Sequence, residues 1–264
     1  MTIRLGIVGW PLQKTFSPLI HKRLSEITNL NLTYEKVPIE NLSLEKLQKI
    51  NNEFDGYNVT IPHKENIYKI FKNVDNVTTS SIAAQVKAVN TVKINNGLLF
   101  LTNTDVDGIN QTFTSINFDI FEKTILILGS GGSAQTAKQI LSNNNKILIA
   151  SRNIQFGDIS YPQVDSIAKN IDVVINTTPL GMPPHEKESL PINLQLFKNL
   201  QLFFNFGYKV SNTLIEGISP NVKIVDGMRM LIAQAISSFN IWTEQEIKFD
   251  DVYEDILERL ENES

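Results

Sequence analysis

Short apolar runs alternate with stretches of helical periodicity along the first third of the chain. Such runs are typical of buried strands, and strands that alternate with helices favour a mainly parallel α/β sheet. Ser17 and Pro18 predict the start of the first helix, as its N-cap and first helical residue. The pattern predicts strands over 3–8, 32–37 and 56–61, helices over 19–28 and 44–50, and a hairpin of 88–94 with 98–102 about Asn95-Asn96-Gly97.

The same alternation resumes after the polar stretch 103–108, which we interpret as the crossover between two domains. A doubly wound dinucleotide-binding domain has this rhythm. Apolar residues at helical spacing then mark the C-terminal part, which could return to the first domain. The elements predicted here are a helix near 107–114, strands over 124–128, 146–150, 172–176, 201–205 and 222–225, and helices over 228–242 and 250–260.

These patterns predict a two-domain α/β protein. We expect residues 1–104, to which 228–264 could return, to form an N-terminal, mainly parallel α/β domain. Residues 105–227 form a Rossmann-type nucleotide-binding domain.

A glycine turn joins the buried run 124–128 to the helix that follows it. The turn reads Gly129-x-Gly131-x-x-Ala134, the spacing of a dinucleotide-binding loop. Glycines there permit a tight turn and a close approach of backbone to a pyrophosphate, which accepts from free N–H groups at the helix start. A strand–helix turn without a ligand is the alternative, and the flanking strand and helix favour nucleotide binding.

The end of the next predicted strand bears on the choice of cofactor. It reads Ser151-Arg152-Asn153 and contains no acidic residue that would accept from a free ribose 2′-OH. A guanidinium at this place matches the oxygens of a 2′-phosphate. We therefore expect NADP rather than NAD.

Composition narrows the classes of function. The 264 residues carry a net charge of −4, which gives no general attraction to nucleic acid or anionic membranes. The absence of cysteine excludes disulfides and thiol nucleophiles and suits the cytoplasm, where we expect the protein to lie. The three histidines have no metal-ligand spacing, no Gly-x-Ser-x-Gly elbow is present, and no segment could span a membrane. We expect no metal, no nucleic acid and no membrane among its partners.

Seven motifs in order make the chain resemble the shikimate dehydrogenase family nearly end to end. They are Gly9-x-Pro11 with Phe16-Ser17-Pro18 and His21; 58–64; 88–91; Asn103-Thr104-Asp105; 129–132; 176–182; and Asp226-Gly227 with Met230, Leu231 and Gln234. The resemblance implies NADP-dependent, reversible reduction of 3-dehydroshikimate to shikimate in chorismate and aromatic amino acid biosynthesis. It implies a substrate domain built from both ends of the chain, an NADP domain in the middle, an active site between them, and a monomer or homodimer.

The resemblance also implies residue roles. A ketone that takes a hydride needs a proton donor beside its oxygen. In the family a Lys–Asp couple does this, which falls on Lys64 and Asp105. The implied substrate contacts are Thr15, Ser17, Thr60, Asn90, Asp105, Tyr208 and Gln234. The expected cofactor contacts are Gly129, Ser130, Gly131, Gly132, Ser133, Ser151, Arg152, Asn153, Phe206 and Gly227.

Departures from the family pattern leave alternatives open. The first loop, 13–18, has Thr15 where serine is usual, and Phe156 stands where a second arginine often lies. One alternative is a quinate/shikimate dehydrogenase with relaxed substrate or cofactor use. The other is a non-catalytic NADP-binding regulator, against which the intact Lys64, Asn90 and Asp105 argue.

Overall fold

The computed structural model describes residues 2–12, 15–182 and 184–263, so Gln13 and Lys14 of the unusual first loop lie outside the described residues. The chain divides into two compact units, Met1–Thr112 with Leu231–Ser264, and Phe113–Met230. Both divisions fall inside helices, α5 (Asp105–Ser115) and α8 (Met228–Thr243). Each unit is built on its own six-stranded sheet.

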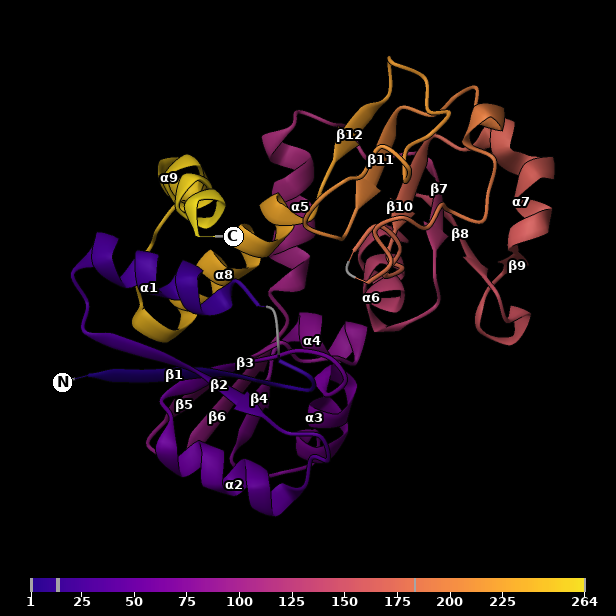
Figure 1. Cartoon of the computed structure of the whole chain (residues 1–264). Helices are drawn as coiled ribbons and strands as arrows, with labels where there is room; N and C mark the ends of the chain where they lie inside the picture. Colours follow the sequence, from indigo (N-terminus) through magenta and orange to yellow (C-terminus); the bar gives the residue numbers. More distant parts are fainter. Residues whose placement is uncertain (1, 13–14, 183, 264) are drawn as a thin grey trace. The chain divides into compact units, whose positions relative to one another are not determined.

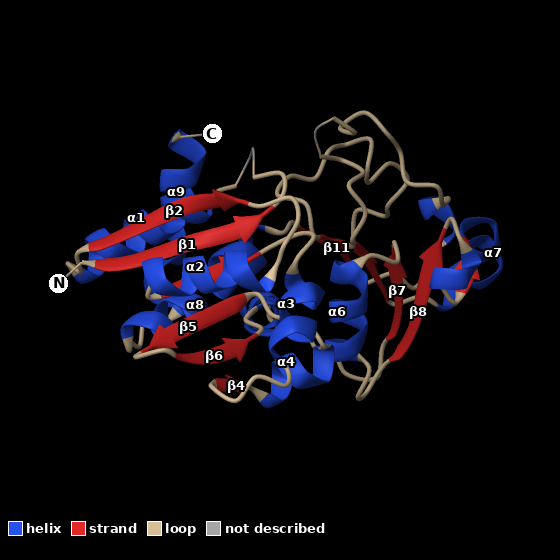
Figure 2. Ribbon diagram, turned by 90° about the horizontal axis from the view of Figure 1, so that it is seen from below, coloured by secondary structure: helices blue, strands red, loops and turns tan. Residues whose placement is uncertain are grey.

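The sheet of the first unit has the strand order β2-β1-β3-β5-β6-β4. β1 pairs in parallel with β2 and β3, β4 is parallel to β6, and β5 runs antiparallel to both of its neighbours. Figure 2 shows β2 and β1 side by side towards one edge and β6 and β4 towards the other. The predicted hairpin is thus β5–β6, with Asn95 opposite Leu98. The strands are β1 (Ile3–Gly9), β2 (Leu32–Pro38), β3 (Gly56–Val59), β4 (Val77–Thr79), β5 (Thr91–Asn95) and β6 (Leu98–Thr102).

Helices cover both faces of this sheet. Figure 1 shows α1 (Ser17–Thr28), α8 and α9 (Phe249–Asn262) on one side and α2 (Leu44–Glu53) and α3 (Lys64–Phe71) on the other. The apolar faces of α2 and α3 pack on Tyr57, Val59 and Val92 of the sheet. On the other side Trp242 donates its indole N–H to the Val92 carbonyl at 2.8 Å, which fixes α8 to β5. The remaining helix of this unit is α4 (Ser81–Val86).

Helix starts differ in part from the sequence prediction. Ser43 caps α2, because its side chain accepts from the Lys46 amide. Ser17, expected as the N-cap of α1, is instead its first helical residue, and the N-cap is Phe16 without a side-chain cap. The Ser17 hydroxyl accepts from Thr15 Oγ1 at 3.2 Å, so it serves the first loop rather than the helix terminus. The sequence did not predict α3 or α4.

The second unit has an all-parallel sheet in the order β12-β11-β10-β7-β8-β9. Numbered from its first strand this is 6-5-4-1-2-3, the doubly wound order whose ligands bind beyond the carboxyl ends of the central strands. β7 (Thr124–Leu128) and β10 (Val173–Asn176) are buried almost throughout. The other elements are β8 (Lys146–Ser151), β9 (Ile159–Ser160), β11 (Leu202–Asn205), β12 (Lys223–Val225), α6 (Gly132–Leu141), α7 (Tyr161–Ile167) and the 3₁₀ turns η1 (Ile154–Phe156), η2 (Ala168–Asn170) and η3 (Leu194–Leu196). The predicted α/β class with a Rossmann-type unit is confirmed.

Two further findings concern what the fold can hold. Within residues 2–12, 15–182 and 184–263, no helix combines the length and apolarity that crossing a membrane requires. The same residues contain no group of three or more His, Cys, Asp or Glu side chains placed to hold a metal ion.

Candidate active site

The first unit brings Lys64 and Asp105 together. Lys64 begins α3, and its carbonyl accepts from the Val89 amide at 2.9 Å, which anchors it beside the segment that leads into β5. Asp105 begins α5, where the partial positive charge of a helix start favours a carboxylate. Lys64 Nζ lies 2.6 Å from Asp105 Oδ2. The lysine side chain is 28% exposed and the aspartate side chain 9%, so the ammonium is reachable and the carboxylate behind it is shielded.

Asn90 holds the other oxygen of this carboxylate. Its Nδ2 donates to Asp105 Oδ1 at 2.9 Å, and its Oδ1 accepts from the Thr104 amide at 2.8 Å. A backbone N–H can only donate, so the Thr104 amide sets which end of the Asn90 side chain faces Asp105. Asp105 is therefore held by two donors, Lys64 and Asn90, one on each oxygen.

Gln234 reaches the same cluster from α8. Its Oε1 lies 3.4 Å from Asn90 Nδ2, while its Nε2 donates to the Leu231 carbonyl at 2.8 Å. One turn further on, the buried Ser238 Oγ lies 2.9 Å from Thr104 Oγ1. The structure thus brings Asn90, Asp105 and Gln234, all expected to meet substrate, together with Lys64.

The first loop is connected to this cluster by a polar network that the sequence reading did not assign. Burial raises the pKa of the Tyr34 hydroxyl well above its usual value, and the Ser17 hydroxyl opposes that shift. Tyr34 donates to Asn58 Oδ1 at 2.7 Å, and Asn58 Nδ2 donates to Ser238 Oγ at 3.0 Å. The motif 58–64 contained Asn58, but nothing in the sequence pattern singled out Tyr34 or Ser238.

The two remaining expected substrate residues are Thr60 and Tyr208. Thr60 directly follows β3, and its methyl group packs so closely on Gly9 that a Cβ at Gly9 would lie 2.3 Å from it. Tyr208 belongs to the second unit and is half-buried there.

The second unit contains a pocket of about 550 Å³ beyond the carboxyl ends of β7, β8 and β10. Gly129 adopts φ +99°, and a Cβ there would lie 2.9 Å from Thr177 Oγ1, so this position requires glycine. Gly131 is the N-cap of α6 without a side-chain cap, and a Cβ built on it would meet nothing within 4 Å. Bare backbone at a helix start, open on the pocket side, fits a pyrophosphate.

Arg152, the cation expected to meet a 2′-phosphate, lines this pocket. Arg152 is exposed and forms no ion pair with any residue that the structure describes. Beside it the hydroxyl oxygens of Ser130 and Ser151 lie 2.9 Å apart. Asn153 instead accepts from the Gln155 amide at 3.0 Å and caps η1. Of the expected cofactor residues, Gly129, Ser130, Gly131, Ser151 and Arg152 line the pocket, whereas Gly132, Ser133, Asn153, Phe206 and Gly227 are outside its lining.

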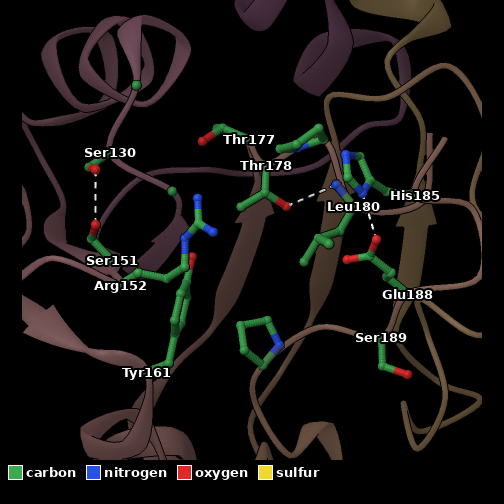
Figure 3. A pocket seen from close by; sticks show the side chains of 14 residues that line it. Ser130, Ser151, Arg152, Tyr161, Thr177, Thr178, Leu180, His185, Glu188 and Ser189 are labelled. Atoms are coloured by element: carbon green, nitrogen blue, oxygen red, sulfur yellow. Dashed lines mark hydrogen bonds and ion pairs between the residues drawn. The ribbon is translucent and has the colours of Figure 1, made fainter. Parts of the chain in front are cut away.

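Several lining residues were missed by sequence reasoning. Figure 3 shows Tyr161 alongside Arg152 on one side of the pocket, and His185 with Glu188 on the opposite side. His185 Nδ1 lies 2.6 Å from Glu188 Oε1. The motif 176–182 contained part of this wall. The full set of residues without an assigned role is Tyr161, Thr177, Thr178, Pro179, Leu180, His185, Glu188, Ser189 and Pro191.

A Rossmann-type unit with a pocket for a phosphate-bearing nucleotide, and an α/β unit with a reachable ammonium held by a carboxylate, define a nucleotide-dependent dehydrogenase. Comparisons with known proteins identify the family. Residues 7–92 match the model of the shikimate dehydrogenase substrate binding domain. A shikimate dehydrogenase (NADP(+)) of Methanococcus maripaludis is 32% identical, over 90% of each chain.

Solved structures agree with this. The shikimate dehydrogenase of Aquifex aeolicus is 27% identical with a TM-score of 0.83, over 97% of each chain. A shikimate dehydrogenase solved in complex with NADP⁺ is 27% identical with a TM-score of 0.82, over 98% of this chain and 96% of that one. The chain belongs to the shikimate dehydrogenase family.

Proposed function

We propose that this protein is an NADP-dependent shikimate dehydrogenase that interconverts 3-dehydroshikimate and shikimate in chorismate and aromatic amino acid biosynthesis. The observation that carries the proposal is the Lys64–Asp105 pair, 2.6 Å apart and held by Asn90. Its relatives named shikimate dehydrogenase (NADP(+)) support it along nearly the whole chain.

The proposed reaction divides between the two units. All of the expected substrate residues except Tyr208 belong to the first unit, in line with the family model over residues 7–92, and the expected cofactor residues belong to the second. Bound NADPH supplies the hydride that reduces the substrate ketone. Lys64 donates its proton to the ketone oxygen as negative charge develops there, and takes it back in the reverse direction. Asp105 holds the ammonium and keeps it oriented.

The remaining expected roles belong to the same proposal. Asn90, Asp105 and Gln234 hydrogen-bond to the ring hydroxyls together with Thr60, while Thr15, Ser17 and Tyr208 bind the carboxylate. Each of these side chains has a polar atom that a polyhydroxy carboxylate can satisfy, and a buried hydrogen bond left unmade is costly. We also propose a cytoplasmic location, which suits the cysteine-free sequence, and a monomeric or homodimeric state.

A spectrophotometric assay tests the function. We expect NADPH formation with shikimate and NADP⁺. The kcat/KM should be lower when quinate replaces shikimate, and also when NAD⁺ replaces NADP⁺. Equal turnover of quinate would favour a quinate/shikimate dehydrogenase. Absence of turnover, with NADP binding intact, would contradict an enzymatic role and favour a binding module.

Arg152 is expected to discriminate between NADP and NAD. Arg152→Ala should raise the KM for NADP about tenfold, the lower end for a hydrogen bond to a charged group, because it removes the guanidinium that meets the 2′-phosphate. The KM for NAD should stay nearly unchanged. Steady-state kinetics with both cofactors measure this.

Lys146→Ala is the matched control, since Lys146 is an exposed cation at the opposite end of the same strand, β8. It should leave both constants unchanged. Equal losses of NADP and NAD in Arg152→Ala would show that Arg152 is not the discriminator.

A further inference from the structure

The nucleotide pocket has fewer cationic side chains than the three oxygens of a 2′-phosphate can accept hydrogen bonds from. Among the described residues that line it, Arg152 is the only arginine or lysine. Phe156, at the position where a second arginine often lies in the family, is 63% exposed and outside the lining. A phosphate monoester presents three strong acceptor oxygens, and one guanidinium fork engages two of them. A further donor beside Arg152 would complete the site.

The register of the sheet places Tyr161 beside Arg152. β8 and β9 pair in parallel with Ser151 opposite Ser160, so the residues that follow, Arg152 and Tyr161, leave the same edge of the sheet as neighbours. Tyr161 is the first residue of α7, and its backbone is fixed on both sides. Ser160 and Gln163 form a capping box, in which the Ser160 amide donates to Gln163 Oε1 at 2.8 Å, and Pro162 follows directly.

The side chain of Tyr161 points into the pocket. Figure 3 shows it rising from the start of α7 along Arg152, with the hydroxyl end towards the arginine. Burial raises the pKa of this hydroxyl, while the charge of Arg152 and the Gly129 backbone, both close to it, work in the opposite direction. The group therefore remains a neutral O–H, able to donate, at physiological pH.

The opposite wall does not suit a phosphate. Glu188 lies there, with its Oε1 2.6 Å from His185 Nδ1, and the Glu188 carboxylate repels an anion. Electrostatics thus directs a bound phosphate monoester to the side of Arg152 and Tyr161.

We propose that the Tyr161 hydroxyl is a second donor to the 2′-phosphate of NADP and that Tyr161, with Arg152, determines cofactor specificity. This inference rests on the proposed function. The aromatic ring of Tyr161 forms the adjoining wall of the pocket for either nucleotide, so within this side chain only the hydroxyl responds to the 2′-phosphate.

Ligand binding to the full-length protein, measured by isothermal titration calorimetry, tests the proposal without the need for turnover. The probes are 2′,5′-ADP and 5′-AMP, which differ only in the 2′-phosphate. Tyr161→Phe removes one oxygen and keeps the ring. It should weaken 2′,5′-ADP about tenfold and leave 5′-AMP unchanged, as expected for one hydrogen bond to a charged group. The difference should be the same from about pH 7.5 to pH 9, because the 2′-phosphate has lost its second proton and the wild-type hydroxyl stays protonated in that range.

Tyr68→Phe is the matched control, because Tyr68 is a half-buried tyrosine on α3 of the first unit. It should change neither affinity. If Tyr161→Phe binds 2′,5′-ADP as tightly as wild type, or loses both probes equally, Tyr161 does not read the 2′-phosphate. A wild-type protein that binds both probes equally would overturn the NADP assignment of the proposed function, and the Tyr161 inference with it. Discrimination by wild type that is undiminished in Tyr161→Phe overturns the Tyr161 inference alone.

Discussion

Replacing Lys64 with alanine should lower kcat by about 10²–10⁴, the usual contribution of general acid–base catalysis. The ammonium is the reachable member of the Lys64–Asp105 pair, so its loss removes the proton donor for the ketone oxygen. The KM for shikimate should change less, because Asn90, Gln234 and the first loop remain. Steady-state kinetics in both directions measure the two constants separately.

Two further variants separate proton transfer from charge. Lys64→Arg keeps a cation near Asp105, but a guanidinium does not give up its proton in the working range, so kcat should also fall sharply. Lys69→Ala is the control, since Lys69 is an exposed lysine on the same helix, paired with Glu65. Near-normal kcat in Lys64→Ala would remove Lys64 from the mechanism.

The second unit was the part of the fold most readily predicted from the sequence. The run 124–128 is β7 without a change of boundary, because four of its five residues are aliphatic and the glycine turn ends it. Parallel strands buried on both faces show as continuous apolar runs, which a sequence reveals directly. In the first unit the hairpin was evident from Asn95-Asn96-Gly97, whereas the short helices α3 and α4 were not. These helices have only eight and six residues, so their apolar residues, such as Ile67 and Phe71 of α3, do not extend far enough to establish a helical period.

Some residues of the candidate site could be predicted from the sequence, and others could not. Residues within local motifs, such as Lys64, Asp105 and Gly129, were named because the motif and the chemistry agree. Tyr161 was not, because its place beside Arg152 depends on the pairing of β8 with β9, a register that no local pattern encodes. Ser238 was missed for a similar reason. It lies on an apolar helix, and only the packing of α8 brings its hydroxyl to Thr104.

Asp105 should be coupled to Lys64, and Asp105→Asn should lower kcat by about a hundredfold, the upper end for the loss of an interaction with a charged group. Both neighbours of this carboxylate are donors, Lys64 Nζ at 2.6 Å and Asn90 Nδ2 at 2.9 Å. The amide of an asparagine has one accepting and one donating end, so its NH₂ must face one of these donors. The substitution therefore removes the negative charge that holds the ammonium and also disturbs the orientation of Asn90.

A double-mutant cycle with Lys64→Ala measures the coupling. Residues that act as a unit are non-additive, so Asp105→Asn should cost little further kcat once Lys64 is absent. Asp107→Asn is the matched control, because Asp107 lies in the same first turn of α5 and shares the contribution of the helix terminus. Thermal unfolding of each variant checks that the fold is retained. If the losses from Lys64→Ala and Asp105→Asn simply add, the two residues act independently and Asp105 does not orient the proton donor.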